Sequence, residues 1–255
     1  MPDAEAAELQ VVDLTVRFGR VTALDGVTVA FHPGVLVGVM GPNGAGKTTL
    51  LNAMTGAVPV AGGEIRLGAR RLNGLPPWTR QSLGIARTFQ RCELVPELSV
   101  EENVLIGAHR RLRLVDELLG RSDDAWLGTD ELLAHFGIGA ELLDQPVGNL
   151  PYGWQRRVEI VRALVAEPSF LLLDEPVAGM DPEESSELGE LIREWVDTTG
   201  RGAVLVEHDV DLVAQICDEV YALDFGVLVA SGPPDAVLSH PKVVEAYLGV
   251  TPEVI

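Results

Sequence analysis

The segment Gly41–Thr49 restricts the fold of this chain more than any other part of it. Its residues are Gly41, Pro42, Asn43, Gly44, Ala45, Gly46, Lys47, Thr48 and Thr49. A continuous apolar run, 35–40, precedes the segment, and the helix-forming run 50–53 follows it. Strand, glycine-rich loop and helix in this order are typical of a phosphate-binding loop, whose backbone N–H groups surround phosphate oxygens at a helix N-terminus. The segment therefore predicts a nucleotide site in an α/β fold.

Two residues of this loop carry the expected chemistry. Lys47 is placed to neutralise the charge of the β- and γ-phosphates of a nucleotide, and the hydroxyl of Thr48 is placed to bind Mg²⁺. A glycine-rich surface loop is the alternative interpretation. The order of strand, loop and helix disfavours it.

A second motif, Phe170–Pro176, supplies two adjacent carboxylates at the end of an apolar run. We expect Asp174 to belong to the Mg²⁺ shell and Glu175 to polarise the attacking water, because phosphoryl transfer depends on positioning and electrostatics. A solvated acidic turn is the alternative. Four large apolar residues directly before the pair make such a turn an awkward interpretation.

Composition limits the class of protein. A chain of 255 residues that is 47% hydrophobic buries a core of one domain, with or without an inserted subdomain. The 19 Lys and Arg against 38 Asp and Glu give a formal charge of −19, which disfavours nucleic acid or anionic lipid as the main partner. Two cysteines are too few for a disulfide scaffold or a zinc site, so we expect a reducing cytosol. No apolar run approaches the roughly 20 residues of a membrane span.

The apolar patterns predict how the chain is organised. The continuous runs 35–40 and 170–173 indicate strands covered on both faces of a parallel sheet, whereas the alternating run 12–18 indicates an antiparallel piece. Between Val100 and Arg162 we expect a helical insertion, with helix over 104–119 and a break at 122–124. A long helix is predicted after Asp181, which caps it, and Gly200 ends it.

Taken together, the motifs resemble the ordered set of the ATPases of ABC transporters. The segments that carry the resemblance are 41–49, 88–90, 150–155, 171–176, 178–181 and 206–209. The resemblance implies a P-loop NTPase (RecA-like) α/β core with an N-terminal antiparallel β subdomain and an inserted helical subdomain. We expect one ABC ATPase domain over 1–255, with the core at about 8–90 and 163–249 and the helical subdomain at about 91–162.

The resemblance also implies roles for single residues. Gln90 would link Mg²⁺ and the attacking water to the transmembrane partner, and His208 would contact the γ-phosphate. Phe18 would stack on adenine, and Asp181 would lie in the loop that crosses to a second ATPase subunit. Taken singly, Gln90 is better explained as a surface amide, His208 as a solvent-facing or satisfied imidazole and Phe18 as a core residue. The order and spacing of the motifs favour the functional interpretation.

Within the family, the chain is similar to the ATP-binding subunits of branched-chain amino acid importers. The segments behind this are 152–160, 178–182, 207–209 and 245–249. The similarity implies permease subunits, a second ATPase subunit and a solute-binding protein as partners, at the cytoplasmic face of the membrane. Importers of urea or amides, lipid-extracting or export ATPases, and non-transport ABC proteins share parts of the pattern and stay open as alternatives.

The signature that would contact nucleotide departs from the family pattern. It reads Leu150, Pro151, Tyr152, Gly153 and Trp154. Pro151 stands where the family has serine, and Trp154 stands where it has glutamine. Proline offers neither a hydroxyl nor an N–H to the γ-phosphate held by the other subunit. We therefore expect this chain to work in a heterodimer with unequal sites rather than in a homodimer.

Overall fold

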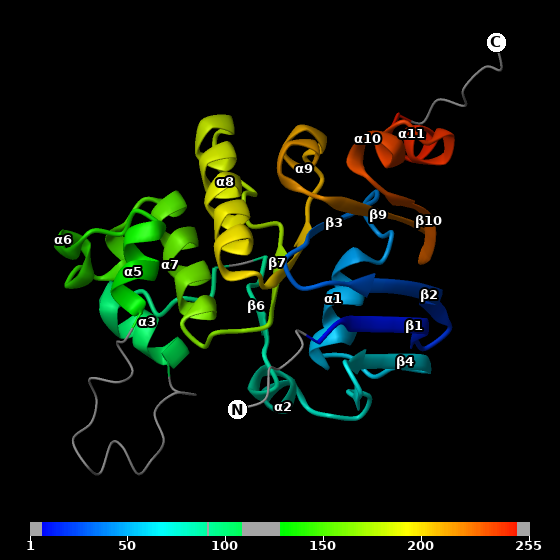
Figure 1. Cartoon of the computed structure of the whole chain (residues 1–255), viewed down its shortest axis with the longest axis horizontal. Coiled ribbons are helices and arrows are strands. Elements are labelled where there is room, and N and C mark those ends of the chain that lie inside the picture. The colour runs from blue at the N-terminus through cyan, green and yellow to red at the C-terminus, as the bar shows by residue number, and fades with distance from the viewer. Residues whose placement is uncertain (1–6, 91, 109–127, 249–255) are drawn as a thin grey trace.

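The computed structural model describes residues 7–90, 92–108 and 128–248, which form two sheets with helices packed around them (Figure 1). The central sheet contains β3 (Leu36–Met40), β6 (Ile85–Arg87), β7 (Phe170–Asp174), β8 (Gly202–Val206), β9 (Glu219–Asp224) and β10 (Val227–Gly232). Its spatial order is β10-β9-β3-β8-β7-β6. All neighbours pair in parallel except β9 and β10, which form an antiparallel hairpin at one edge. The expected parallel sheet is confirmed, and the antiparallel edge strand was not foreseen.

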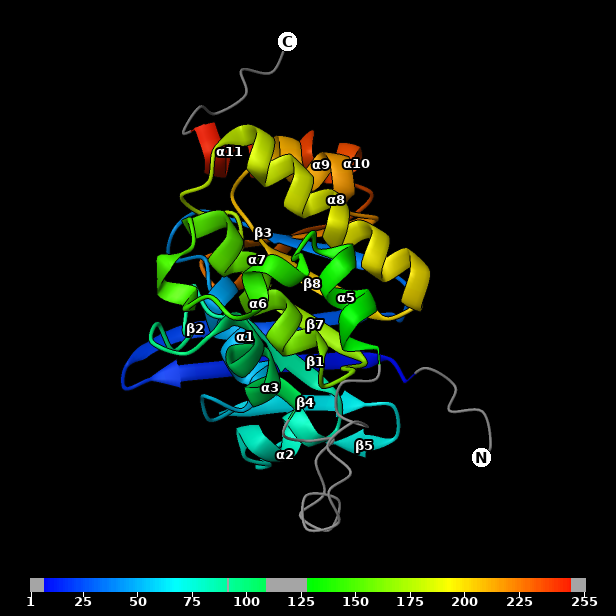
Figure 2. The same ribbon diagram turned by 90° about the vertical axis from the view of Figure 1, so that its left-hand side faces the viewer.

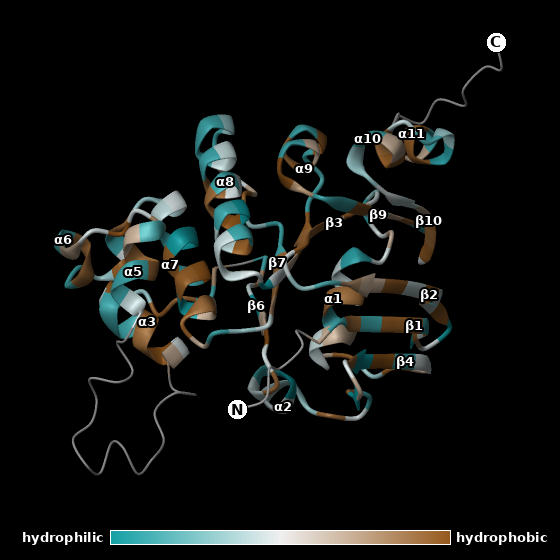
Figure 3. Ribbon diagram, in the orientation of Figure 1, coloured by the Kyte–Doolittle hydropathy of each residue, from teal (hydrophilic) through white to brown (hydrophobic). Residues whose placement is uncertain are grey.

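A smaller antiparallel sheet is formed by two strands that precede the phosphate-binding loop in the sequence and two that follow it. It has the order β2-β1-β4-β5, with β1 at Leu9–Phe18, β2 at Val21–Phe31, β4 at Gly62–Leu67 and β5 at Arg70–Arg71. Hydropathy alternates along β1, whereas β3 is apolar throughout (Figure 3). This difference is expected, because β3 is covered on both faces and all of its residues are buried.

The central sheet lies between two layers, because successive residues of a strand face opposite sides. From β8, Ala203 and Leu205 join the core that includes residues of α8, while Val204 and Val206 join the core beneath the antiparallel sheet. The second core also contains α1 (Lys47–Thr55), which follows the phosphate-binding loop. The loop and α1 are therefore held between the two sheets.

The helical part lies beside the sheets, on the left in Figure 1. Its elements are α3 (Val100–Ala108), α5 (Thr129–His135), α6 (Ala140–Leu143), a short 3-10 helix (Val147–Asn149) and α7 (Tyr152–Leu164). Helix α3 covers residues 104–108 of the helix expected over 104–119. The rest of that helix and the break at 122–124 lie outside the described residues. We propose that this group is the inserted subdomain of about 91–162.

Helix α8 (Pro182–Thr199) matches its sequence signals at both ends. The Asp181 carboxylate accepts from the Glu184 N–H at 2.9 Å, and the Glu184 side chain accepts in return from the N–H of Asp181, which completes a capping box. Gly200 ends the helix with φ 64°, a left-handed conformation that favours glycine. The predicted long helix is confirmed.

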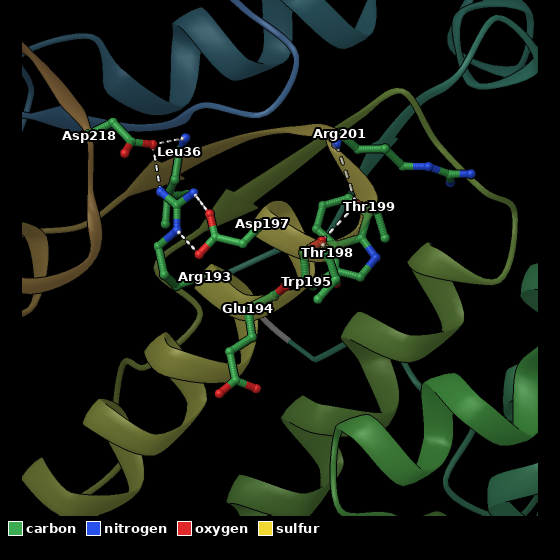
Figure 4. A network of polar contacts seen from close by, with 9 residues as sticks. All are labelled: Leu36, Arg193, Glu194, Trp195, Asp197, Thr198, Thr199, Arg201 and Asp218. Carbon is green, nitrogen blue, oxygen red and sulfur yellow. Dashed lines mark hydrogen bonds and ion pairs between the residues drawn. The ribbon is translucent and has the colours of Figure 1, made fainter.

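A polar network ties α8 to the sheet (Figure 4). Arg193 of α8 binds Asp197 one turn later and donates to Asp218 Oδ2 at 2.5 Å. The same Asp218 oxygen accepts from the N–H of Leu36, the first residue of β3, at 2.8 Å. One carboxylate therefore joins α8, the start of β3 and the segment before β9.

The remaining helices flank this framework. They are α2 (Pro77–Ser82), α9 (Val210–Ile216), α10 (Pro234–Leu238) and α11 (Pro241–Leu248). In the view of Figure 2, α8, α9 and α10 lie above the central sheet and the antiparallel sheet lies below it. Within the described ranges, every helix is too short or too polar to span a bilayer.

The two cysteines are packed as separate thiols. Cys217 is buried and Cys92 is half-buried, and neither forms a disulfide. Burial raises the pKa of the Cys217 thiol to about 12. A thiol with so high a pKa is unreactive at neutral pH.

Candidate nucleotide-binding and hydrolysis site

Two glycines allow the loop after β3 to close tightly. Gly41 has φ 149°, and a Cβ there would lie 2.2 Å from the backbone oxygen of Leu223. Gly46 has φ 105° and caps α1, and a Cβ there would lie 2.7 Å from the side chain of Leu24. No other residue type fits at either position without displacing its neighbours.

The loop borders two adjoining hollows. One, of about 260 Å³, is lined by Asn43–Thr49 with Ala23, Gln90 and Glu175. The other, of about 480 Å³, is lined by Gly41, Pro42, Asn43, Gln90, Glu175, His208 and Ala246. Asn43, Gln90 and Glu175 border both hollows. The structure thus brings together the loop and three of the side chains expected to act on ATP.

Lys47 is the first residue of α1 and is only 7% exposed. Its Nζ donates to the carbonyl oxygens of Gly41 at 2.6 Å and Pro42 at 3.2 Å. Burial lowers the pKa of Lys47, and the carboxylates of Glu175 and Asp174 oppose that shift. A cation beside the positive end of a helix makes this hollow suited to phosphate.

Asp174 ends β7 and faces the start of α1. Its Oδ1 accepts from the Thr48 hydroxyl at 3.4 Å, and the residue is only 2% exposed. A hydroxyl and a carboxylate are oxygen ligands of the kind that Mg²⁺ prefers. These two side chains are therefore of the kind that would hold a magnesium ion.

The other oxygen of Asp174 has a partner that the sequence analysis missed. Arg87, the last residue of β6, donates to Asp174 Oδ2 at 2.8 Å and to the Asn52 side-chain oxygen at 2.5 Å. The available signal was an arginine at the end of a short apolar strand, immediately before Thr88, Phe89 and Gln90. Sequence spacing gave no reason to pair it with a carboxylate 87 residues away.

Glu175 directly follows β7 in a strained conformation. Its φ is 49°, which non-glycine residues adopt at a cost of about 1–3 kcal/mol. Its N–H donates to the carbonyl oxygen of Val206 at 2.9 Å, and its Oε2 accepts from Gln90 Nε2 at 2.8 Å. These contacts hold the carboxylate at the edge of both hollows, where it is placed to orient a water molecule.

His208 follows β8 and depends on Glu207, a second residue whose role was missed. Glu207 is fully buried and accepts from the N–H of Val177 at 3.3 Å and of His208 at 3.2 Å. Its Oε2 also lies 3.6 Å from His208 Nδ1. Burial raises the pKa of Glu207, although the two N–H donors oppose the shift. Glu207 therefore holds the backbone at His208 and the turn after Glu175.

The segment that contains Gln90 is attached to α7. The buried Arg156 donates to the carbonyl oxygen of Phe89 at 2.9 Å, binds that of Gln90, and pairs with Glu159 at 2.8 Å. Glu159 in turn accepts from the N–H of Glu93 at 3.3 Å. The backbone around Gln90 is therefore bound directly to α7, a connection that the sequence did not reveal.

The signature residues lie apart from the two hollows. Pro151 caps α7 without a side-chain hydrogen bond, and Leu150 is buried just before it. The guanidinium of Arg157 lies 4.9 Å from the ring of Trp154, so that Trp154 packs on its own helix. Tyr152 and Gly153 lie against the segment Gly179–Glu184.

Two further predicted residues also lie outside the hollows. Phe18 ends β1 and is 48% exposed. Asp181 is exposed at the start of α8. Their proposed contacts with adenine and with a second subunit stay predictions.

The geometry at these strand ends defines the class of protein. A phosphate-binding loop, a carboxylate facing its threonine and a neighbouring glutamate are the parts with which P-loop ATPases cleave nucleotide. Comparison with known proteins specifies the family. The family described as "ABC transporter" matches residues 24–178, and the family described as "Branched-chain amino acid ATP-binding cassette transporter" matches residues 227–253.

The chain thus belongs to the ABC transporter family, as an ATPase whose ATP hydrolysis is coupled to transport. It is 38% identical over 256 residues to LivG of Escherichia coli (strain K12), a high-affinity branched-chain amino acid transport ATP-binding protein. That alignment covers 94% of this chain and 97% of LivG. BraF of Pseudomonas aeruginosa, with the same description, is 37% identical over 252 residues, and the alignment covers 94% of this chain and 97% of BraF.

Solved structures agree with this assignment. A nucleotide-free ATP-binding cassette from an ABC transporter has a TM-score of 0.84 at 30% identity and covers 96% of this chain and 100% of its own. The ADP conformation of the cassette MJ1267 has a TM-score of 0.85 at 30% identity, and the match covers 96% of this chain and 99% of MJ1267. The predicted fold and the predicted ABC ATPase activity are confirmed.

We expect Glu207→Gln to change how stability depends on pH. A carboxyl whose pKa is raised by folding stabilises the protein below its unfolded pKa, about 4.3, and loses that contribution as pH rises through the folded value. Glutamine does not titrate, so the variant should gain stability relative to the parent as pH rises. Urea unfolding between pH 4 and 8 measures this difference. The control is Glu194→Gln, because Glu194 is an exposed glutamate on α8. If the difference in free energy of unfolding between Glu207→Gln and the parent does not vary with pH, the raised pKa of Glu207 is contradicted.

Proposed function

We propose that this chain drives the import of branched-chain amino acids or related small polar solutes. The observation that carries the proposal is the match of residues 227–253 to the branched-chain amino acid transporter family. Lipid-extracting or export systems and non-transport ABC proteins are the alternatives. The ATPase subunit drives transport, whereas other chains select the solute. A gene for a solute-binding protein beside the gene for this chain would therefore favour import over the alternatives.

The site supports a division of labour in ATP hydrolysis. Thr48 and Asp174, with Gln90 near them, would hold Mg²⁺, which neutralises charge on the β- and γ-phosphates when bound. Lys47 and the loop N–H groups bind the phosphates. Glu175 orients and deprotonates the attacking water, and His208 contacts the γ-phosphate.

Substitutions at Glu175 and Lys47 should separate catalysis from binding. Glu175→Gln should retain ATP affinity and reduce turnover on the order of 100-fold or more, because it removes the group that accepts the proton of water. Lys47→Ala should instead weaken ATP binding. Both are measured in the complex reconstituted with its permease and with a leucine-loaded solute-binding protein. Parent-like ATPase in Glu175→Gln would exclude the assigned role, and stimulation by a urea-loaded but not a leucine-loaded binding protein would exclude the proposed solute.

We propose that a groove beside Gln90 receives the permease. The groove, called here the Trp78 groove, has a volume of about 430 Å³ and is formed by α2, the end of α1 and the segment from Ile85 to Phe89. Trp78 is 72% exposed and Phe89 is 42% exposed. Exposed aromatic residues in a groove are typical of protein interfaces. The charge of −19 opposes attraction to anionic lipid, so we place the chain peripherally at the cytoplasmic face through this protein contact.

Replacing the exposed tryptophan should break this contact without disturbing the fold. Trp78→Ser should weaken association with the permease by about 30-fold, the loss expected for an interface hot spot of about 2 kcal/mol. Co-purification from detergent measures it. Phe225→Ser is the matched control, because Phe225 is 88% exposed on the β9–β10 hairpin. Tight binding of the isolated chain to anionic vesicles would contradict the proposal.

We also propose that the second ATPase subunit is a different chain. Each site of an ABC dimer combines the loop of one subunit with the signature of the other, so the two halves of this chain serve different sites. Pro151 supplies neither hydroxyl nor N–H at the start of α7. The site that uses this signature would be the weaker one, while the loop, Glu175 and His208 would complete an active site with the partner's signature.

Restoring the family signature should raise the ATPase rate of the isolated chain more than that of the full complex. Pro151→Ser together with Trp154→Gln should raise ATPase roughly tenfold in chain-only preparations, because a hydrogen bond to a charged group contributes about 1.5–3 kcal/mol. The increase should be smaller in the full complex. Pro151→Ala, which restores only the N–H, and Pro151→Ser alone, which keeps the Trp154 packing, separate the contributions. An isolated parent chain that dimerises on ATP and hydrolyses it as fast as the double variant would contradict the proposal.

A further inference from the structure

Arg87 occupies a place in the site that neither the motifs nor the family comparison assigns. It ends β6, where it pairs in register with Leu172 of β7, two residues before Asp174. Its side chain is 7% exposed and that of Asp174 is 2% exposed. The guanidinium and the carboxylate therefore meet almost entirely out of water, where their interaction is strong and directional.

Three contacts hold the guanidinium in one orientation. One terminal nitrogen donates to Asp174 Oδ2 at 2.8 Å, and the other donates to Asn52 Oδ1 at 2.5 Å. The Phe89 ring lies against it, with its centroid 5.1 Å from the guanidinium carbon. Within the described residues, the buried Nε has no hydrogen-bond partner. The orientation of Arg87 thus depends on Asp174, Asn52 and Phe89.

This arrangement gives the two oxygens of Asp174 different roles. Oδ2 is taken by Arg87, while Oδ1 lies 3.4 Å from the Thr48 hydroxyl, on the side of the phosphate-binding loop. A carboxylate held in this way offers one oxygen to a cation. Mg²⁺ is small and octahedral and accepts single carboxylate oxygens, whereas Ca²⁺ has 6–8 ligands and readily accepts both oxygens of one carboxylate.

We propose that Arg87 is a positioning residue that makes Asp174 a one-oxygen ligand and so favours Mg²⁺ over Ca²⁺ in the nucleotide site. The inference rests on the proposed Mg²⁺ role of Thr48 and Asp174. Removing the guanidinium frees Oδ2 and opens two-oxygen coordination to the larger ion. Loss of the guanidinium also leaves the negative charge of Asp174 uncompensated, and this attracts Mg²⁺ and Ca²⁺ alike. The electrostatic change therefore largely cancels in the ratio of the two affinities, and the ratio reports the coordination geometry.

The test compares how Mg²⁺ and Ca²⁺ support binding of a non-hydrolysable ATP analogue to the full chain, measured by calorimetry. In Arg87→Met the preference for Mg²⁺ over Ca²⁺ should fall on the order of 10-fold, within the range for groups that orient a metal ligand. Asn52→Ala should lower it less, because the pair with Asp174 stays while one support of Arg87 is lost. That variant keeps the test informative if Arg87→Met does not fold.

Arg80→Met is the matched control. Arg80 is also buried against α1, but it donates to the carbonyl oxygens of Ala53 and Met54 at 2.6 and 2.9 Å and, among the residues that the structure describes, to no carboxylate. It should lower the unfolding temperature and leave the preference unchanged. An unchanged preference in both Arg87→Met and Asn52→Ala, or an equal fall in Arg80→Met, would overturn the role of Arg87. A parent chain whose nucleotide affinity does not respond to Mg²⁺ would instead overturn the proposed metal site.

Discussion

The site depends on the parallel pairing of β6, β7, β8 and β3, because parallel strands end at the same edge of a sheet. The phosphate-binding loop follows β3, Asp174 ends β7 and Glu175 comes next, His208 follows β8 and Gln90 follows β6. The register places Asp174 beside Val206 and Leu172 beside Arg87. A slip of one residue would turn each of these side chains to the opposite face of the sheet. The register of the parallel strands therefore determines which side chains lie next to one another in the site.

Three sets of buried charged groups do the local positioning around the hollows. Arg87 binds Asp174, Arg156 binds Glu159, and Glu207 accepts from two backbone N–H groups. Such groups contribute little net stability, because desolvation offsets most of their attraction. Their effect here is on orientation, since each one holds a segment that borders the nucleotide hollows.

The same contacts connect the hollows to more distant surfaces. Arg156 joins the backbone of Gln90 to α7, whose first residues are the signature. On the other side, Arg87 and Phe89 border the Trp78 groove. The segment around Gln90 therefore contacts both α7 and the Trp78 groove. These contacts connect the nucleotide hollows to the two surfaces where we propose that a permease and a second ATPase subunit bind.

The sequence by itself determined the features that depend on neighbouring residues. It gave the loop 41–49 between a strand and a helix, the buried runs of β3 and β7, and the Asp181 cap and Gly200 end of α8, since patterns of polarity, glycine and capping act over a few positions. Only the tertiary structure decided the pairs Arg87 with Asp174, 87 residues apart, and Arg156 with Phe89, 67 residues apart. It also decided that Trp154 packs on Arg157 and that β10 adds an antiparallel edge. These contacts depend on strand order and on how helices pack against the sheet, and no local pattern encodes which distant side chain completes a buried charge.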